Sequence, residues 1–165
     1  MKRILITGMS GTGKSAVIGE LRRRAYRAVD LDTPQWSHWA DAAPEDHLTP
    51  RAGQDWVWRE DRVRDLLSRR DGEDLFVSGC ATNMSKLFDV IDTIILLSMP
   101  LDTLMGRLAA RRPGGYGHMA DERRKIAELV ATIEPLLRRS ADHEINTARS
   151  VTDAVEDVLT LVKSR

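Results

Sequence analysis

The sequence lacks several features that would point to other classes of protein. It contains one cysteine, Cys80, so no disulfide can form within the chain. It has zero net charge and no long run of one sign, so general attraction to nucleic acid or to a membrane surface has little support. We expect no secretory signal, because the apolar segment at Ile4 is too short, and no apolar run approaches the length of a membrane span. These absences favour a cytoplasmic protein whose partners are neither nucleic acid nor membrane.

The remaining composition is that of a single folded domain. The chain has 165 residues, of which 42% are hydrophobic, enough for one proper core. We therefore expect one domain over residues 1–165. Composition leaves the oligomeric state open between a monomer and a homodimer.

The most specific motif in the sequence is Gly8-Met9-Ser10-Gly11-Thr12-Gly13-Lys14-Ser15, which has the form G-x-x-x-x-G-K-[ST]. In this loop, glycines allow backbone N–H groups to point at phosphate oxygens, the lysine reaches the β- and γ-phosphates, and the serine binds Mg²⁺. A short apolar run over residues 3–7 precedes the motif and a helical pattern over residues 16–24 follows it, as the motif requires. The motif predicts ATP and Mg²⁺ as cofactors. The expected nucleotide-binding residues here are Gly8, Ser10, Gly11, Thr12, Gly13, Lys14, Ser15 and Ala16.

A second motif overlaps the first and suggests a different ligand. Gly11-x-Gly13-x-x-Ala16 fits the fingerprint of dinucleotide-binding oxidoreductases, in which an acidic residue about 20 positions later binds a ribose. Asp30 and Asp32 lie at about that distance. This alternative explains neither Gly8 nor the Lys-Ser pair that follows the last loop glycine.

Strand and helix patterns alternate along the whole chain, which predicts an α/β fold with a parallel sheet covered by helices on both faces. The predicted strands are residues 3–7, 26–31, 74–78, 91–97 and 143–146. The predicted helices are residues 16–24, 56–69, a helix that starts at Pro100, 121–139 with a kink at Pro135, and 151–161 with Ser150 as its N-cap. We expect residues 33–54 to be irregular and residues 113–117 to form a glycine-rich break.

Two carboxylates follow the second predicted strand. Asp30 and Asp32 are two residues apart in an extended segment, so their side chains would point the same way. Ligands of open α/β sheets bind beyond the carboxyl ends of strands. One carboxylate can then hold Mg²⁺ while the other accepts the proton of an attacking hydroxyl. We expect Asp30 to join Ser15 at the metal and Asp32 to act as the base, with the reverse assignment open.

Arginines precede the glycine-rich break. Arg107 and Arg111 are four residues apart, so they share one helix face, and Arg112 follows. Guanidinium groups fit phosphate oxygens, and their fixed charge stabilises a transferring phosphoryl group. The glycines would allow a lid of about residues 111–120 to close and exclude water. We expect Lys14, Arg107 and Arg111 to act in catalysis, and Arg107 to contact the nucleotide as well.

The site for a phosphate acceptor is expected in a segment of about residues 33–70. All the tryptophans of the chain fall there, at positions 36, 39, 56 and 58, and Arg59 follows them. Aromatic rings can form the wall of a pocket, and an arginine can bind an anionic group of the acceptor. After the third predicted strand, the backbone at Gly79 could approach a ligand. The expected substrate-binding residues are Asp32, Trp36, Trp56, Arg59 and Gly79.

On these residues the chain resembles the small P-loop kinases of the shikimate kinase, gluconate kinase and adenylate kinase group. The resemblance covers nearly the whole chain and implies the sheet order 2-3-1-4-5. It implies that Asp30 and Asp32 serve Mg²⁺ and the acceptor hydroxyl, and that Arg59 matches an arginine that binds the substrate carboxylate in shikimate kinases. It also places the segment that ends at Arg149 against the adenine. The chain departs from shikimate kinases at Ser78-Gly79-Cys80, where they carry three glycines.

The sequence therefore predicts an ATP- and Mg²⁺-dependent phosphotransferase that moves the γ-phosphate to a hydroxyl of a small-molecule acceptor. One alternative is a nucleoside monophosphate kinase. Another, of a different class, is a nucleotide-binding sensor or assembly ATPase without a small-molecule acceptor. The identity of the acceptor and the choice between ATP and GTP stay open.

Overall fold

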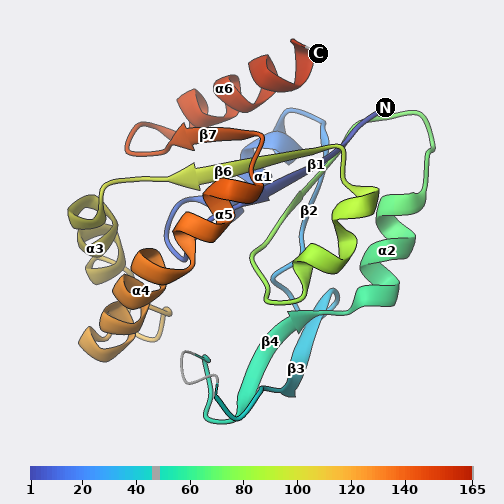
Figure 1. The fold of residues 1–165 in the computed structure, drawn as a ribbon. Helices are drawn as coiled ribbons and strands as arrows, with labels where there is room; N and C mark the ends of the chain where they lie inside the picture. Colours follow the sequence, from blue (N-terminus) through green and yellow to red (C-terminus); the bar gives the residue numbers. More distant parts are fainter. Residues whose placement is uncertain (46–48, 165) are drawn as a thin grey trace.

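The computed structural model describes residues 1–45 and 49–164 and is built around one parallel sheet (Figure 1). The sheet has five strands in the order β2-β5-β1-β6-β7. Their bounds are Arg3–Thr7 (β1), Arg27–Asp30 (β2), Leu75–Ser78 (β5), Thr93–Ser98 (β6) and His143–Asn146 (β7). When only these strands are numbered, the order is 2-3-1-4-5, which confirms the order implied by the family resemblance.

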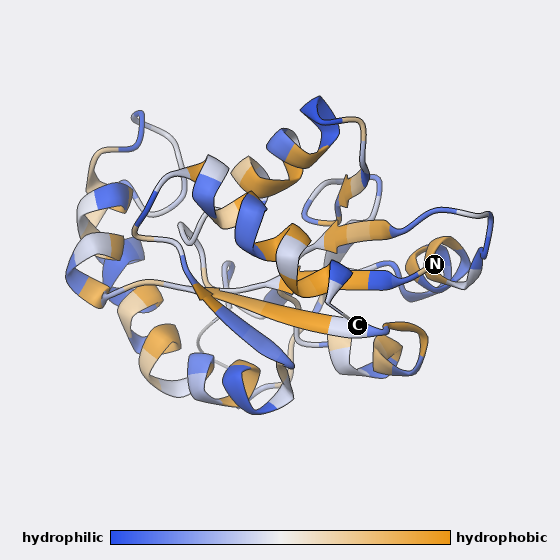
Figure 2. Cartoon of the chain, turned by 90° about the horizontal axis from the view of Figure 1, so that it is seen from above, coloured by the Kyte–Doolittle hydropathy of each residue, from blue (hydrophilic) through white to orange (hydrophobic). Residues whose placement is uncertain are grey.

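Helices cover both faces of this sheet. Helices α1 (Lys14–Arg23) and α6 (Val151–Lys163) pack on one face, and α2 (Glu60–Ser68), the 3-10 helix η1 (Met84–Val90) and α5 (Glu134–Ser140) pack on the other. Alternate residues of β1 point to opposite faces of the sheet. Ile4 and Ile6 pack with α1 and α6, whereas Leu5 belongs to the hydrophobic cluster of α2, η1 and α5. Figure 2 shows that hydrophobic residues concentrate in the central strands, while the helices alternate between hydrophobic and hydrophilic residues. The α/β fold with helices on both faces is thus confirmed.

The remaining helices form a smaller cluster beside the main core. Helix α3 (Leu101–Ala109) packs against α4 (Ala120–Thr132) through Leu104, Leu108 and Ile126, which are all buried. The segment between these two helices contains the predicted glycine-rich break. None of the helices in residues 1–45 and 49–164 combines the length and the apolar character needed to cross a membrane.

The segment that we expected to be irregular contains a β-hairpin. Strands β3 (Ser37–Asp41) and β4 (Gln54–Trp58) pair antiparallel, with Trp39 opposite Trp56 (Figure 1). The helix predicted from residue 56 begins only at Glu60, so its first turn was wrong. Residues 56–58 alternate aromatic and β-branched side chains, which suits a strand, and burial of Trp58, only 2% exposed, anchors that strand. Residues 46–48 of the expected irregular segment lie outside the described residues.

The long helix predicted over residues 121–139 is interrupted. Helix α4 ends at Thr132 and α5 begins at Glu134, with Pro135 in the first turn of α5. Proline lacks a backbone N–H and clashes with the preceding turn, so the chain starts a new helix there instead of continuing with a kink. The helix predicted from residue 151 is confirmed, and the Ser150 hydroxyl accepts a hydrogen bond from the backbone N–H of Asp153 as its N-cap.

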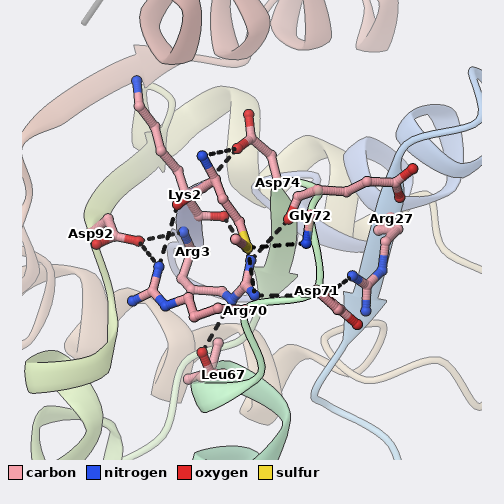
Figure 3. A network of polar contacts seen from close by, with 11 residues as sticks. Lys2, Arg3, Arg27, Leu67, Arg70, Asp71, Gly72, Asp74 and Asp92 are labelled. Atoms are coloured by element: carbon pink, nitrogen blue, oxygen red, sulfur yellow. Dashed lines mark hydrogen bonds and ion pairs between the residues drawn. The ribbon is translucent and has the colours of Figure 1, made fainter.

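A polar network fastens the amino-terminal end of β1 (Figure 3). The Arg3 side chain is fully buried and donates hydrogen bonds to the backbone carbonyls of Leu67 and Glu73, at 3.1 and 3.0 Å. The Asp92 carboxylate accepts from the Arg3 backbone N–H at 2.7 Å and pairs with Arg70 at 3.0 Å. Because β1 begins at this network and ends at the phosphate loop, the network holds the strand that carries the candidate site.

Candidate active site

The loop between β1 and α1 takes a backbone path that requires glycine. At Gly8, a Cβ atom would lie 2.5 Å from the carbonyl oxygen of Leu97, too close for any side chain. At Gly11, φ is +86°, a conformation that L-residues with side chains rarely adopt. The loop leads directly into the amino terminus of α1, where free N–H groups and the helix dipole favour an anion. The local geometry is therefore that of a phosphate-binding loop.

A cleft of about 1130 Å³ opens at this loop, beyond the carboxyl ends of β1, β2 and β5. The phosphate loop and two aspartates of β2 and its exit form one part of its lining. The rest comes from the β-hairpin, the segment after β5, the lid segment and helices α4 and α5. The cleft residues used below are Lys14, Ser15, Asp30, Asp32, Trp39, Asp55, Trp56, Cys80, Thr82, Phe88, Arg111, Ile126, Leu129, Ile133 and Leu136.

Lys14 is folded back over the phosphate loop. Its ammonium group donates hydrogen bonds to the backbone carbonyls of Gly8 at 2.6 Å and Met9 at 3.0 Å. Burial lowers the pKa of Lys14 from its usual range, while the nearby Cys80 and Asp32 act in the opposite direction. A bound phosphate would add the negative charge that such a half-buried ammonium group lacks.

Ser15 and Asp30 lie together at the edge of the cleft. The Ser15 hydroxyl donates a hydrogen bond to Asp30 Oδ2 at 2.8 Å, and Asp30 Oδ1 accepts one from the backbone N–H of Asp32 at 2.9 Å. A hydroxyl and a carboxylate are the hard oxygen ligands that Mg²⁺ takes alongside phosphate oxygens and water. The two predicted metal residues are thus in contact and fit a magnesium ion.

The hairpin brings Trp56 to Asp32. The indole Nε1 donates a hydrogen bond to Asp32 Oδ1 at 2.6 Å, so one carboxylate oxygen is held by the ring. Both side chains line the cleft, and Lys14 is close enough to Asp32 to be influenced by its charge. Two predicted substrate-binding residues therefore meet at the phosphate loop, and one of them orients the other.

The same hairpin contributes residues that the sequence reasoning did not select. Asp55 lines the cleft and accepts hydrogen bonds from the Trp56 backbone N–H at 2.8 Å and from the Thr82 hydroxyl at 2.7 Å. The Trp39 and Trp56 rings meet edge to face with centroids 5.1 Å apart. The Arg51 guanidinium carbon lies 3.9 Å from the Trp39 ring centroid. Strand-like alternation around Trp56 was the one signal that could have revealed this arrangement.

Helices α4 and α5 form an apolar wall of the cleft. Ile126, Leu129, Ile133 and Leu136 line it from these helices, and Phe88 lines it from η1. Leu136 is 50% exposed, so this wall is open to ligand as well as packed on the core.

The two arginines predicted to act in catalysis, Arg107 and Arg111, occupy different places in the structure. Arg111 lines the cleft and donates a hydrogen bond to the Tyr116 carbonyl within the lid segment. Arg107 is not among the residues that line the described cleft. It donates instead to the Thr147 carbonyl at 2.9 Å, and the Thr147 hydroxyl donates to the Thr12 carbonyl at 2.7 Å. Arg107 therefore braces the loop after β7 against the phosphate loop, next to the expected nucleotide.

Four further predicted site residues point elsewhere in the described structure. Arg149 pairs with Asp157 of α6. Trp36 lines a separate small hollow beside α2, and Arg59 donates to the Pro34 carbonyl at 3.2 Å. Gly79 lies under a tryptophan, because a Cβ atom there would be 2.9 Å from Trp58 Nε1. Their roles in binding nucleotide or substrate stay predictions.

Cys80 lies in the cleft but is not activated. Burial raises the pKa of its thiol, and the opposing influence of Lys14 is smaller. A thiol with a raised pKa is protonated at neutral pH and is a weak nucleophile. The cleft therefore offers carboxylates, not a thiolate, as its basic groups.

Together, the glycine-rich loop at the end of β1, the helix that follows it and the strand order define a P-loop nucleotide-binding domain. A family model described as an AAA domain matches residues 4–128. Because the match covers more than half of the chain, this protein belongs to that AAA domain family. No curated protein sequence matches the chain.

Solved structures extend the comparison to the whole chain. Shikimate kinase from Acinetobacter baumannii in complex with shikimate is 20% identical, with a TM-score of 0.64 over 99% of this chain and 94% of that one. A gluconokinase from Sinorhizobium meliloti 1021 is 18% identical, with a TM-score of 0.60 over 96% and 90%. A sugar kinase from Janibacter sp. HTCC2649 is 19% identical, with a TM-score of 0.58 over 99% and 95%. The chain has the fold that these small-molecule kinases share, as the resemblance predicted.

Proposed function

We propose that the protein is an ATP- and Mg²⁺-dependent kinase that transfers the γ-phosphate to a hydroxyl of a small molecule. The observation that carries this proposal is that Lys14, Ser15 and Asp32 line one cleft. A phosphate loop alone accounts for nucleotide binding. A carboxylate across from it, in a cleft with room for a second ligand, supplies what transfer requires.

The residues divide between the donor and the acceptor. The loop N–H groups and Lys14 hold the β- and γ-phosphates, and Ser15 and Asp30 are the residues that would hold Mg²⁺. When bound, Mg²⁺ neutralises charge on these phosphates. Arg111, on the lid segment, lines the same cleft, and in this proposal it contacts the transferring group, where its fixed charge stabilises the transition state.

Asp32 is the proposed base. The acceptor oxygen forms a bond to the γ-phosphorus while the bond from that phosphorus to the bridging oxygen breaks and ADP departs. The hydroxyl proton passes to Asp32, whose Oδ1 is held by Trp56, so Oδ2 is the oxygen that we propose accepts it. The apolar wall on α4 and α5 would exclude water and so limit hydrolysis of ATP.

The test is incubation of the protein with ATP, Mg²⁺ and a panel of hydroxyl compounds that includes sugars, cyclic acids, nucleosides and nucleoside monophosphates. Mass spectrometry should find a phosphorylated product in the same amount as ADP, and GTP run in parallel defines the donor. Transfer to nucleoside monophosphates alone would instead identify a nucleotide kinase. Nucleotide binding without transfer, with a protein partner retained only in ATP, would favour a sensor or assembly ATPase and contradict the proposal.

We also propose that the protein acts in the cytoplasm, because an ATP-dependent small-molecule kinase works where ATP is abundant. It would bind its acceptor as a monomer or a homodimer, without nucleic acid or membrane.

A further inference from the structure

The acceptor half of the cleft carries an unusual balance of charge. The cationic side chains among the described lining residues are Lys14 and Arg111, and both belong to the phosphate loop or the lid. The hairpin side contributes Asp32 and Asp55. Neither aspartate forms an ion pair with any residue that the structure describes. On the hairpin side of the described cleft, an acceptor would therefore meet negative charge. The cations of the described lining would be occupied by the nucleotide.

The arginines nearest to the hairpin do not line the cleft. Arg59 donates to the Pro34 carbonyl at 3.2 Å, and Arg62 donates to the Gln35 carbonyl at 3.1 Å. The Arg51 guanidinium lies on the face of Trp39 and does not line the cleft. Recognition of a carboxylate or phosphate normally uses an arginine fork aimed into the pocket. The described part of the acceptor half has no such fork.

Asp55 is held in a fixed orientation. Its Oδ1 accepts from the Trp56 backbone N–H at 2.8 Å, and its Oδ2 accepts from the Thr82 hydroxyl at 2.7 Å. Together, the two hydrogen bonds prevent the side chain from turning away from the cleft that it lines. An anion bound beside it would be repelled, and the cations of the described lining, Lys14 and Arg111, lie on the nucleotide side.

Apolar side chains make up much of the rest of the acceptor half. The Trp39 and Trp56 rings meet edge to face on the hairpin, and Phe88, Leu129 and Ile133 line the cleft from the helices. Such a wall gains free energy by covering an apolar body, and aromatic rings beside carboxylates also suit a cation.

We infer that the acceptor is a hydroxyl compound with an apolar body and without an anionic group, and that any charge it bears is positive. The inference rests on the proposed function, because it describes the acceptor of the same reaction. It separates this protein from an enzyme that phosphorylates a sugar acid, a cyclic carboxylic acid or a nucleoside monophosphate. Recognition of those acceptors would require a cation in the acceptor half, where the described lining has Asp32 and Asp55.

The test uses three compounds with the same phenylpropyl skeleton and a hydroxyl group: phenyllactate, 3-phenyl-1,2-propanediol and phenylalaninol, which are anionic, neutral and cationic at pH 7. Each is titrated into the protein saturated with Mg²⁺ and a non-hydrolysable ATP analogue, with tryptophan fluorescence as the readout. We expect the diol and the amino alcohol to bind at least tenfold more tightly than phenyllactate. Equal or tighter binding of phenyllactate, or no binding of any of the three at millimolar concentration, would overturn the inference.

A variant pair assigns the effect to the cleft. Asp55→Asn should reduce the discrimination against phenyllactate several-fold, whereas Asp41→Asn, on the exposed end of the same hairpin, should leave it unchanged. Unchanged discrimination in Asp55→Asn would contradict the role given to this carboxylate. Because the readout is binding, it does not depend on phosphoryl transfer. Failure of the proposed function would show instead as nucleotide turnover without any phosphorylated product.

Discussion

The Trp56 indole N–H and the Asp32 carboxylate are joined by a hydrogen bond of 2.6 Å, across 24 residues of chain. This contact connects the β-hairpin to the exit of β2, next to the phosphate loop. Through it, the hairpin of the proposed acceptor site also fixes one oxygen of the proposed base. The orientation of Asp32 therefore depends on the hairpin being formed.

Replacement Trp56→Phe tests this relationship, because it keeps an aromatic ring and removes the donor. A hydrogen bond to a charged group contributes about 1.5–3 kcal/mol, so we expect kcat to fall roughly 10- to 100-fold if that energy is expressed in the transition state. The KM for ATP should change little. Steady-state kinetics measure both quantities.

The matched control is Tyr26→Phe, which also removes a polar hydrogen from an aromatic side chain. Tyr26 packs against Phe76 in the layer of α1 and α6, away from the cleft. It should leave kcat within about twofold of wild type. An equal loss of kcat in both variants would show that the effect comes from general destabilisation and not from the contact with Asp32.

Lys14→Ala should weaken nucleotide binding strongly. Lys14 is the only lysine that lines the described cleft, and burial already lowers the pKa of its ammonium group in the absence of phosphate. We expect the affinity for ATP, measured by calorimetry, to fall at least tenfold. Lys163→Ala, at the exposed end of α6, should bind ATP like wild type, and intact ATP binding in Lys14→Ala would contradict the donor site.

Asp30→Asn should raise the Mg²⁺ concentration needed for activity. The variant keeps an oxygen that can accept from the Ser15 hydroxyl but removes the charge that favours a divalent cation. We expect the half-saturating Mg²⁺ concentration to rise severalfold while the maximal rate at high Mg²⁺ is partly recovered. An unchanged Mg²⁺ dependence, measured at constant ATP, would remove Asp30 from the metal site.

Glu144→Gln should reduce the dependence of stability on acid pH. The Glu144 carboxylate accepts from Arg138 at 2.9 Å and from the Ser98 hydroxyl at 2.7 Å, and the Arg138 contact lowers its pKa below the ordinary value of 4.5. A lowered folded-state pKa contributes stability above pH 4.5 that is lost as the pH falls through the folded pKa. At pH 7, Glu144→Gln should lower the free energy of unfolding by less than about 1 kcal/mol, because the Arg138–Glu144 pair is partly exposed.

Urea unfolding at several pH values checks this prediction. Wild type and Glu144→Gln should differ at pH 7 and converge toward pH 3. Glu128→Gln, at an exposed position of α4, should follow wild type at every pH. A difference between wild type and Glu144→Gln that does not shrink in acid would contradict the assigned pKa shift.

The donor half of the site could be predicted because its information is local. Gly8, Lys14 and Ser15 lie within eight consecutive residues, and their spacing alone encodes the phosphate loop. Asp30 could be placed for a related reason, since carboxyl ends of parallel strands gather at one edge of a sheet. Neither inference needed the order of the strands in the sheet, which the family resemblance implied.

The acceptor half could not be predicted in the same way. The turn between β3 and β4 is long and lacks a short hairpin signal, so the strand around Trp56 was read as the start of a helix. The apolar wall of the cleft could not be recognised either, because an apolar residue facing a cleft and one facing a core produce the same periodicity. The direction of an arginine such as Arg59 depends on tertiary contacts that spacing does not contain.

The central claim, that this cleft moves a phosphoryl group from ATP to a hydroxyl with Asp32 as the base, is tested most directly by ³¹P NMR of the reaction. With ATP, Mg²⁺ and the acceptor panel, wild type should produce a phosphomonoester resonance in the same amount as ADP. Asp32→Asn should slow its appearance by about 100-fold or more, while Asp61→Asn, in the first turn of α2, should not. Equal rates in Asp32→Asn and wild type, or release of inorganic phosphate without an ester, would contradict the account.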